Sequence, residues 1–406
     1  MKNTAEWKEQ GMTERNLDFD RIVNRKNTRC IKYDFAAENG YPEDVLPLWV
    51  ADMDFRTSSF VEDALAELTR HNIYGYSDTR PGDGFFEAVS GWMKRHHHWE
   101  TDPAWHVKTP GVCFAIAAAI RGLTAPGDAV IIQEPVYHPF GSLILQNGRK
   151  KVSSDLIRDA EKTYRMDYDD FEKKIIENNV KMFILCNPHN PVGRVWTGEE
   201  LRRIGRICAE HRVIVFSDEI HSDFVWEGEH QVFQEADPSF RNITITATAP
   251  SKTFNLAGLQ QSNIFIPDSG LRQSFTEELH RTGLDEPTIF GITAAQAAYE
   301  KGETWYEAMK AYIRKNICFA EAFIRDRLPG TEMKKPEGTY LLWVDFRGTG
   351  LNAAELEEMI VRKARLWLNS GSVFGRAGEG FQRINAACPQ SILREALERL
   401  ERALLS

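Results

Sequence analysis

Short apolar runs alternate with segments of helical periodicity from about residue 60 to residue 270. Four runs rich in Ile, Val and Thr predict buried strands, at 129–133, 181–186, 212–218 and 242–249. Segments with helical spacing lie around them, at 114–123, 168–178 and 198–211. Strands that alternate with helices predict an α/β fold, in which a mostly parallel sheet is covered by helices on both faces.

The helix predicted at 198–211 has a clear start signal. Thr197 precedes it, and Glu199 and Glu200 fall in its first turn. A hydroxyl at the cap position and carboxylates in the first turn both stabilise the free N–H groups at a helix start. We therefore expect this helix to begin after Thr197.

The pattern changes after about residue 290. A long helical pattern is followed by a strand, a second helix and a Gly-rich loop, at 293–328, 338–346, 352–365 and 371–380. This order is typical of a separate α+β unit. We therefore divide the chain into an N-terminal arm that contributes to the small domain, a large domain and a C-terminal small domain, at 1–50, 51–289 and 290–406.

Composition narrows the functional classes. The 406 residues are 42% hydrophobic and 27% charged, which is ordinary for an enzyme. A formal net charge of −9, with the basic residues scattered, argues against a nucleic-acid partner. The N-terminus lacks the apolar core of a signal peptide, and no apolar run is long enough to cross a membrane. The six cysteines form no CxxC pair, so we expect free thiols, no metal site and a cytoplasmic location.

Polar side chains follow three of the predicted strands. Asn187 comes directly after the run at 181–186, Asp218 ends the run at 212–218, and Ser251 and Lys252 follow the run at 242–249. Any one of them could be a turn, a helix cap or a surface charge. However, ligands of open α/β sheets bind at the carboxyl ends of the strands, and these residues share that edge.

The set suits the chemistry of pyridoxal 5′-phosphate (PLP). This cofactor needs a lysine that bonds it and moves a proton, a carboxylate beside the ring nitrogen, a donor to the phenolic oxygen and an aromatic face. Lys252, Asp218, Asn187 and Tyr137 can fill these roles in that order. Ser251 and the start of the helix that follows Pro110-Gly111 offer donors to the phosphate.

The motifs together resemble the fold-type I PLP enzymes, the aspartate aminotransferase superfamily. They are, in order, PGV, EPVYHPF, NPHNPVGRVW, SDEIHSD, APSKTFNLAGLQ, GTYLLW and FQRINAACP. LPLWVADMDF (46–55), YGYSD (74–78) and SKTFNLAGLQ resemble its carbon–sulfur β-lyase branch, the MalY/PatB type, which includes cystathionine β-lyases and cystalysin. The likeness runs from about residue 25 to the C-terminus. It implies a large domain with a mostly parallel seven-stranded sheet and a smaller α+β domain.

The resemblance also implies roles for single residues. Lys252 would carry PLP as a Schiff base, with Asp218 at the pyridine nitrogen, Asn187 at the phenolic oxygen and Tyr137 stacked on the ring. His221 stands where aminotransferases usually have a tyrosine of similar duty.

The phosphate and the substrate have their own implied partners. The amides of Val112 and Cys113, with Ser251, would hold the phosphate. Tyr76 would reach the phosphate of a neighbouring subunit, which implies a homodimer. Arg383 would bind the substrate α-carboxylate through its planar guanidinium.

Two positions depart from the family pattern. Gln260 stands where many aminotransferases have a phosphate-binding arginine, and Ala249 stands where some relatives have a hydroxyl residue. Neutral donors and Tyr76 would then carry more of the phosphate binding.

Three functions remain open from the sequence. The leading one is α,β-elimination of cystathionine or related S-substituted cysteines to a thiol, pyruvate and ammonia. An aminotransferase would share the early steps and return the proton to the cofactor. A PLP-fold transcriptional regulator is the third, although about 25 residues before the match are too few for the usual DNA-binding domain.

Two motifs fall outside this assignment. The run His96-His97-His98 has no acidic or cysteine partner at metal-binding spacing, so we interpret it as a solvated helix end. The loop at 375–380 is no dinucleotide fingerprint, and we expect it to shape the substrate entrance near Arg383. Cys113 and Cys186 are expected to be packing residues.

Overall fold

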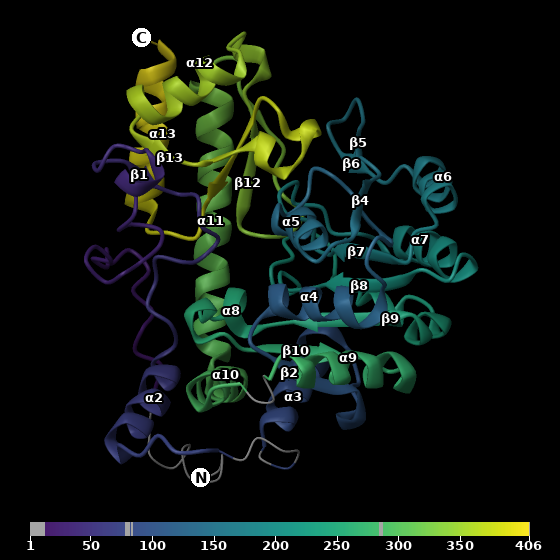
Figure 1. Ribbon diagram of the computed structural model, residues 1–406. Helices are drawn as coiled ribbons and strands as arrows, with labels where there is room; N and C mark the ends of the chain where they lie inside the picture. The colour runs from purple at the N-terminus through teal and green to yellow at the C-terminus, as the bar shows by residue number, and fades with distance from the viewer. Residues whose placement is uncertain (1–12, 78–81, 83, 284–286, 406) are drawn as a thin grey trace.

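A seven-stranded sheet forms the centre of the larger part of the molecule (Figure 1). The computed structural model describes residues 13–77, 82, 84–283 and 287–405. The strand order is β2 (His106–Thr109), β10 (Ser262–Phe265), β9 (Thr244–Thr248), β8 (Ile214–Asp218), β7 (Met182–Cys186), β3 (Ala129–Ile132), β4 (Lys150–Ser153). β10 is antiparallel to both neighbours, and the other pairings are parallel. The predicted mostly parallel sheet is confirmed.

The central strands are buried on both faces, which explains their continuous apolar runs. Successive residues of β7 alternate, because Ile184 packs on one side of the sheet and Phe183 and Leu185 pack on the other. The first side is covered by α4 (Val112–Leu123), α5 (Pro139–Gln146) and α9 (Ser269–Arg281). The second is covered by α6 (Tyr168–Asn178) and α7 (Gly198–Glu210).

The start of α7 has the predicted capping geometry. The Thr197 hydroxyl accepts the N–H of Glu200 at 3.2 Å, and the Glu200 carboxylate accepts the N–H of Thr197 at 2.9 Å. This reciprocal capping box satisfies two N–H groups that have no partner within the helix.

A second sheet has four strands in the order β11 (Glu332–Met333), β12 (Leu341–Asp345), β15 (Phe381–Asn385), β14 (Asn369–Ser370), and all its pairings are antiparallel. It packs with α11 (Glu303–Arg327), α12 (Ala353–Glu358) and α13 (Gln390–Leu405). The helix α11 runs from beside the large sheet to the far end of the second unit (Figure 1). This arrangement gives the expected α+β character.

The helical pattern at 293–328 is not one helix. It is divided into α10 (Ile289–Lys301) and α11, with Gly302 between them. A Cβ on Gly302 would lie 2.5 Å from the Phe254 ring and 2.6 Å from the Ala298 carbonyl oxygen. The glycine therefore allows a close approach to Phe254 at the point where the chain changes direction. Periodicity alone does not reveal this contact.

The N-terminal segment joins the second unit through β1 (Leu46–Pro47), which pairs in parallel with β13 (Leu366–Trp367). The helices α2 (Ser59–His71) and α3 (Phe85–His97) pack against α10 instead. Pairing of β1 with β13 favours the arm as part of the small domain. The domain boundaries at 50 and 289 stay predictions, and residues 1–12 of the arm lie outside the described residues.

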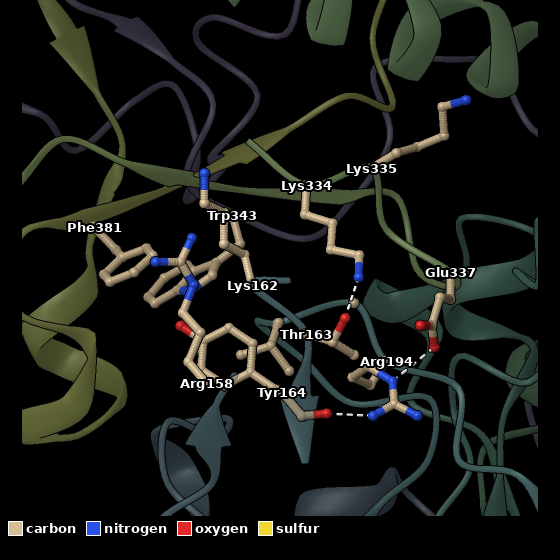
Figure 2. Close-up of a pocket in the computed structure, with 12 residues that line it drawn as sticks. Arg158, Lys162, Thr163, Tyr164, Arg194, Lys334, Lys335, Glu337, Trp343 and Phe381 are labelled. Carbon is tan, nitrogen blue, oxygen red and sulfur yellow. Dashed lines mark hydrogen bonds and ion pairs between the residues drawn. The ribbon is translucent and has the colours of Figure 1, made fainter. Parts of the chain in front are cut away.

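A narrow, strongly charged pocket lies where the two units meet (Figure 2). The hairpin of β5 (Ile157–Arg158) and β6 (Tyr164–Arg165) contacts the four-stranded sheet there. Arg158 pairs with Asp345 at 2.9 Å, and the Trp343 indole donates to the Tyr164 hydroxyl at 3.1 Å. These contacts couple the hairpin to the second unit, and they place Trp343 at the junction.

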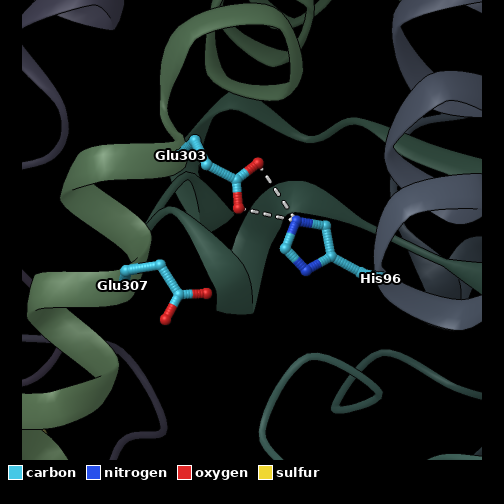
Figure 3. A group of neighbouring side chains, drawn as sticks. All are labelled: His96, Glu303 and Glu307. Carbon is cyan, nitrogen blue, oxygen red and sulfur yellow. Dashed lines mark hydrogen bonds and ion pairs between the residues drawn. The ribbon is translucent and has the colours of Figure 1, made fainter.

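The interpretation of the histidine run as a solvated helix end is wrong for two of its three members. His97 is buried and lies 2.9 Å from Asp223, and His96 stacks on Trp92 with ring centroids 3.9 Å apart. His96 also pairs with Glu303 of α11 at 2.9 Å, with Glu307 beside them (Figure 3). The fold thus supplies acidic partners that are 126 residues away from His97 and 207 residues away from His96 in the sequence.

None of the described helices is long and apolar enough to cross a membrane.

Candidate active site

The candidate active site is a cavity of about 380 Å³ at the carboxyl edge of the large sheet. It is closed on one side by the segment at 49–51 and on another by the end of the four-stranded sheet. Most of the residues singled out from the sequence line it: Val112, Cys113, Tyr137, Asp218, His221, Ser251, Lys252, Arg383. These residues are far apart in the sequence but meet here, because all of them except Arg383 lie at or after the end of a strand of the large sheet, whereas Arg383 lies within β15 of the second sheet.

Strand ends place these side chains. Asp218 is the last residue of β8, and Ser251 and Lys252 belong to α8 (Pro250–Thr253), which directly follows β9. Tyr137 follows β3, where its ring meets the Phe140 ring edge-on at 5.6 Å. The sheet therefore fixes which side chains face the cavity before any loop is considered.

The cavity meets the start of α4 at a position suited to an anion. No side chain caps this helix, so its first N–H groups are available at Val112 and Cys113. Gly111 has φ 122°, a conformation that side chains disfavour, and its N–H donates to the Ser262 hydroxyl at 3.2 Å. Free amides and the helix dipole favour a phosphate at such a place. Neutral Gln260 lines the cavity nearby.

Asp218 is a buried carboxyl group with few partners. Its Oδ1 accepts the N–H of Ile220 at 3.1 Å, and no described side chain forms an ion pair with it. Burial raises the pKa of Asp218 to about 7, against the opposing effects of the Ile220 amide and the Lys252 charge. A cationic ligand that enters the cavity would therefore stabilise the charged form of this carboxylate.

Lys252 is half-buried and lines the same cavity. Its Nζ donates to the carbonyl oxygen of Ala51 at 2.7 Å. Burial lowers the pKa of Lys252 most, and the Arg383 charge lowers it further, whereas the charge of Asp52 raises it. The lysine is thus closer to the neutral form than an exposed lysine, as a proton acceptor requires.

Arg383 is held by neutral oxygens only. It donates to the Asn190 side chain at 3.0 Å, the Trp49 carbonyl at 2.7 Å and the Asn369 side chain at 2.5 Å. Its Nε is buried without a partner, and the Phe374 ring lies 4.8 Å away. Burial lowers the pKa of Arg383 to about 10, so it stays charged at neutral pH. Within the described residues this buried cation has no carboxylate partner, and an anionic ligand would supply one.

His221 is neutral at physiological pH. Burial, and then the nearby charges of Lys252 and Arg383, hold the pKa of His221 well below its usual value. Its Nδ1 is buried without a hydrogen-bond partner among the described residues. The imidazole can therefore offer a hydrogen bond to a ligand without adding charge.

The sequence interpretation of the NPHNP motif needs correction. Asn187 does not line the cavity: it is fully buried, and its amide donates to the Gln231 carbonyl at 3.1 Å. Asn190, three residues later, lines the cavity and contacts Arg383. The motif turns at the strand end, so the second asparagine faces the ligand space and the first packs beneath it.

Tyr76 does not line the cavity of its own chain. It lies in the segment between α2 and α3 and is fully exposed. A contact with a ligand would need a second copy of the chain.

Several residues of the cavity were not singled out from the sequence as ligand contacts. His138, Trp49 and Asn369 line it, and Phe374 packs on Arg383. Phe374 immediately precedes the loop at 375–380, which is thus near Arg383, as expected. Trp49 stacks on Trp367 at 4.5 Å, which fixes the wall of the cavity.

Asp218 gives a prediction on stability. Its raised pKa means that folding favours the protonated form, so this contribution is complete below the unfolded pKa near 4 and is lost as the pH rises through about 7. In the cofactor-free protein, Asp218→Asn should therefore raise the free energy of unfolding by roughly 4 kcal/mol at pH 8 and by about 1–2 kcal/mol at pH 5. Urea unfolding at the two pH values measures this. An equal effect at both would contradict it.

The comparisons agree with this geometry. The family model described as aminotransferase class I and II matches residues 43–400. Cystathionine β-lyase PatB of Bacillus subtilis (strain 168) is 42% identical over 96% of this chain and all of its own. The PLP-bound crystal structure of a Clostridium difficile 630 protein, provisionally described as an aminotransferase, has a TM-score of 0.92 at 43% identity, over 95% of this chain and 99% of its own. Cystalysin from Treponema denticola, whose crystal structure contains PLP, has a TM-score of 0.91 at 37% identity, over 96% and 98%. The chain therefore belongs to the aminotransferase class I and II family, with the fold of the fold-type I PLP enzymes.

Proposed function

We propose that the protein is a PLP-dependent carbon–sulfur β-lyase that acts on cystathionine or related S-substituted cysteines. The observation that carries the proposal is the meeting of Lys252, Asp218 and Arg383 in one cavity. Asp218 and Arg383 are buried and Lys252 is half-buried, and each charge lacks a neutralising ion-pair partner within the part of the chain that the structure describes. The similarity to cystathionine β-lyase PatB and to cystalysin supports the lyase reaction.

The residues of the cavity fit PLP. The amides of Val112 and Cys113, with Ser251, would hold the phosphate. When bound, PLP supplies an electron sink for the charge that develops at the substrate Cα. Asp218 would pair with the pyridine nitrogen, and its raised pKa would fall as this partner enters.

Ring contacts complete the cofactor site. Tyr137 would stack on the ring, and Asn190, in place of Asn187, would donate to the phenolic oxygen. The Asn190 Oδ1 accepts a hydrogen bond from Arg383. The amide nitrogen of Asn190 therefore points away from Arg383. His221 would add a neutral hydrogen bond.

The reaction uses two basic side chains differently. Arg383 binds the substrate α-carboxylate, which orients the Cα–H bond toward Lys252. The Lys252 amine, whose pKa is lowered by burial, accepts the Cα proton in its neutral form. The Cβ–S bond then breaks, and the sulfur leaves with its electron pair and takes up a proton. Hydrolysis of the remaining three-carbon unit gives pyruvate and ammonia.

Transamination is the second candidate. The Clostridium difficile relative described as an aminotransferase favours it, since the early steps are shared. The two reactions differ in where the proton goes after it leaves Cα. An aminotransferase needs a keto acid to complete each cycle, whereas elimination needs none.

A product assay separates the two reactions. With L-cystathionine and no keto acid, the PLP-loaded protein should release pyruvate through many turnovers, in equal amount to the thiol. S-methylcysteine and cysteine, tested alongside, would rank the leaving groups. Product formation that stops after one equivalent per site, and resumes on addition of a keto acid, would refute the lyase proposal.

Assembly as a homodimer is also part of the proposal. Tyr76 is fully exposed in the single chain although it is a large aromatic residue. We expect that Tyr76 of each copy reaches the phosphate in the other copy. Gln260 is neutral, so it offers no positive charge to a phosphate in the cavity. A hydrogen bond from Tyr76 of the other copy would then carry more of the phosphate binding.

A cytoplasmic location completes the proposal. All six cysteines are free, and three of them are buried. Free thiols of this kind are ordinary in a reducing compartment.

A further inference from the structure

One backbone oxygen receives two buried hydrogen bonds beside the cavity. The Ala51 carbonyl accepts the Lys252 Nζ at 2.7 Å and the Tyr340 hydroxyl at 2.9 Å. The three residues come from the N-terminal segment, from α8 and from the strand edge before β12. A carbonyl oxygen has two lone pairs, so the two donors together use its full capacity.

The segment that carries Ala51 is fixed by hydrogen bonds to the carbonyls of its neighbours. The Asn385 amide donates to the carbonyls on either side of it, those of Val50 and Asp52, at 2.6 Å each. Arg383 donates to the Trp49 carbonyl at 2.7 Å. With its neighbours held in this way, the Ala51 carbonyl cannot turn away from Lys252 without breaking several hydrogen bonds.

Tyr340 reaches Lys252 only through this carbonyl. It is fully buried and does not line the cavity. Its ring meets His221 edge-on at 5.7 Å and Phe224 edge-on at 4.8 Å, which sets the direction of the hydroxyl. The Tyr340 hydroxyl is therefore placed to fix the direction of the Ala51 carbonyl and to occupy one of the two lone pairs of its oxygen.

We propose that Tyr340 is a positioning residue, which with the Ala51 carbonyl forms a docking point for the Lys252 amine whenever that amine is not bonded to the cofactor. The inference rests on the proposed function, because in the PLP-loaded enzyme the amine would be free only while a substrate amine takes its place. The docking point keeps the amine at the wall of the cavity with its lone pair toward the substrate.

The hydrogen bond from Tyr340 to the Ala51 oxygen also affects the protonation of Lys252. A carbonyl with a single donor stabilises an ammonium more strongly than one already bonded to a phenol. Removal of the Tyr340 hydroxyl should therefore favour protonated Lys252. The other groups that act on this amine are Asp52, Asp218 and Cys113, which favour the charged form, and Arg383, which opposes it; neutral His221 faces it as well.

The test is Tyr340→Phe, which keeps the buried ring and removes one oxygen. In the cofactor-free protein, acetic anhydride labelling of Lys252, followed by mass spectrometry across a pH series, reports the neutral fraction of the amine without any substrate. The variant should label about 5- to 10-fold more slowly near pH 8, with its titration shifted to higher pH. In the PLP-loaded protein, kcat should fall by a similar factor with KM little changed, and the acidic limb of the kcat profile should move up.

Tyr164→Phe is the matched control. Tyr164 is also a buried tyrosine whose hydroxyl joins the two units, through the Trp343 indole at 3.1 Å, and it lies outside the cavity lining. Its labelling profile should match that of the wild type. Equal losses in both variants, or a wild-type profile in Tyr340→Phe, would overturn the proposal.

A second variant covers the case in which Tyr340→Phe does not fold. 3-Fluorotyrosine placed at position 340 keeps the hydroxyl and makes it a stronger donor, so Lys252 labelling should shift to lower pH. No shift in that protein would overturn the proposal. Because labelling needs neither PLP nor substrate, a protein without lyase activity but with these shifts would refute the proposed function and leave the docking point supported.

Discussion

Lys252→Ala is expected to leave the purified protein without the visible absorption band of lysine-bound PLP. Elimination should fall by at least about 10⁴-fold, because the same side chain that holds the cofactor also moves the Cα proton. The cavity should stay folded, since the lysine makes only one described hydrogen bond, to Ala51. Absorbance after PLP addition and dialysis, together with pyruvate release, gives both readouts.

Lys94→Ala is the control for that variant. Lys94 is exposed and pairs with Glu100 on the surface, at 2.6 Å. It should retain the band and the activity. If Lys252→Ala kept the band after dialysis, or if the wild type took up no PLP at all, the assignment of the cofactor site would be wrong.

The Arg383→Ala variant should still bind the cofactor, but its binding of the substrate α-carboxylate should be lost. The guanidinium is buried and is held by neutral oxygens, so its charge has no described carboxylate partner until one enters the cavity. Loss of one partner of a buried charge pair costs roughly 2–5 kcal/mol, which corresponds to about 30- to 5,000-fold in kcat/KM. Arg383→Lys should recover little, because an ammonium cannot bind a carboxylate in the two-point manner of arginine.

Substrate analogues make the carboxylate assignment specific. Wild-type protein should strongly prefer S-methylcysteine to its amide, whereas Arg383→Ala should treat the two nearly alike. Arg376→Ala, on the exposed part of the adjacent loop, should behave as the wild type. A preserved preference for the acid in Arg383→Ala would show that another cation binds the carboxylate.

The cavity residues that lie at the ends of strands could be predicted from the sequence. Asp218, Ser251 and Lys252 follow runs that are unambiguous as buried strands, and parallel strands bring their carboxyl ends to one edge. The assignment of Asn187 failed because both asparagines of NPHNP follow the same strand. Only the path of the turn decides that Asn190 faces the cavity.

Contacts over long sequence distances account for the other differences. The division of the 293–328 pattern depends on Phe254 packing against Gly302, and the burial of His97 depends on Asp223. Tyr340 carries no sequence signal for its role, since its partner is a backbone oxygen about 290 residues earlier in the chain. Periodicity predicts which face of a helix or strand is apolar, but it does not predict which other element packs against that face.

Attachment of PLP to Lys252 is the claim on which the rest depends, and a chemical label tests it directly. Borohydride added to the PLP-loaded protein reduces the bond between the cofactor and the lysine amine, and peptide mass mapping then locates the label. The label should lie on the peptide that contains Lys252, at one per chain. A label on any other lysine, or none in a protein that has taken up PLP, would contradict the account.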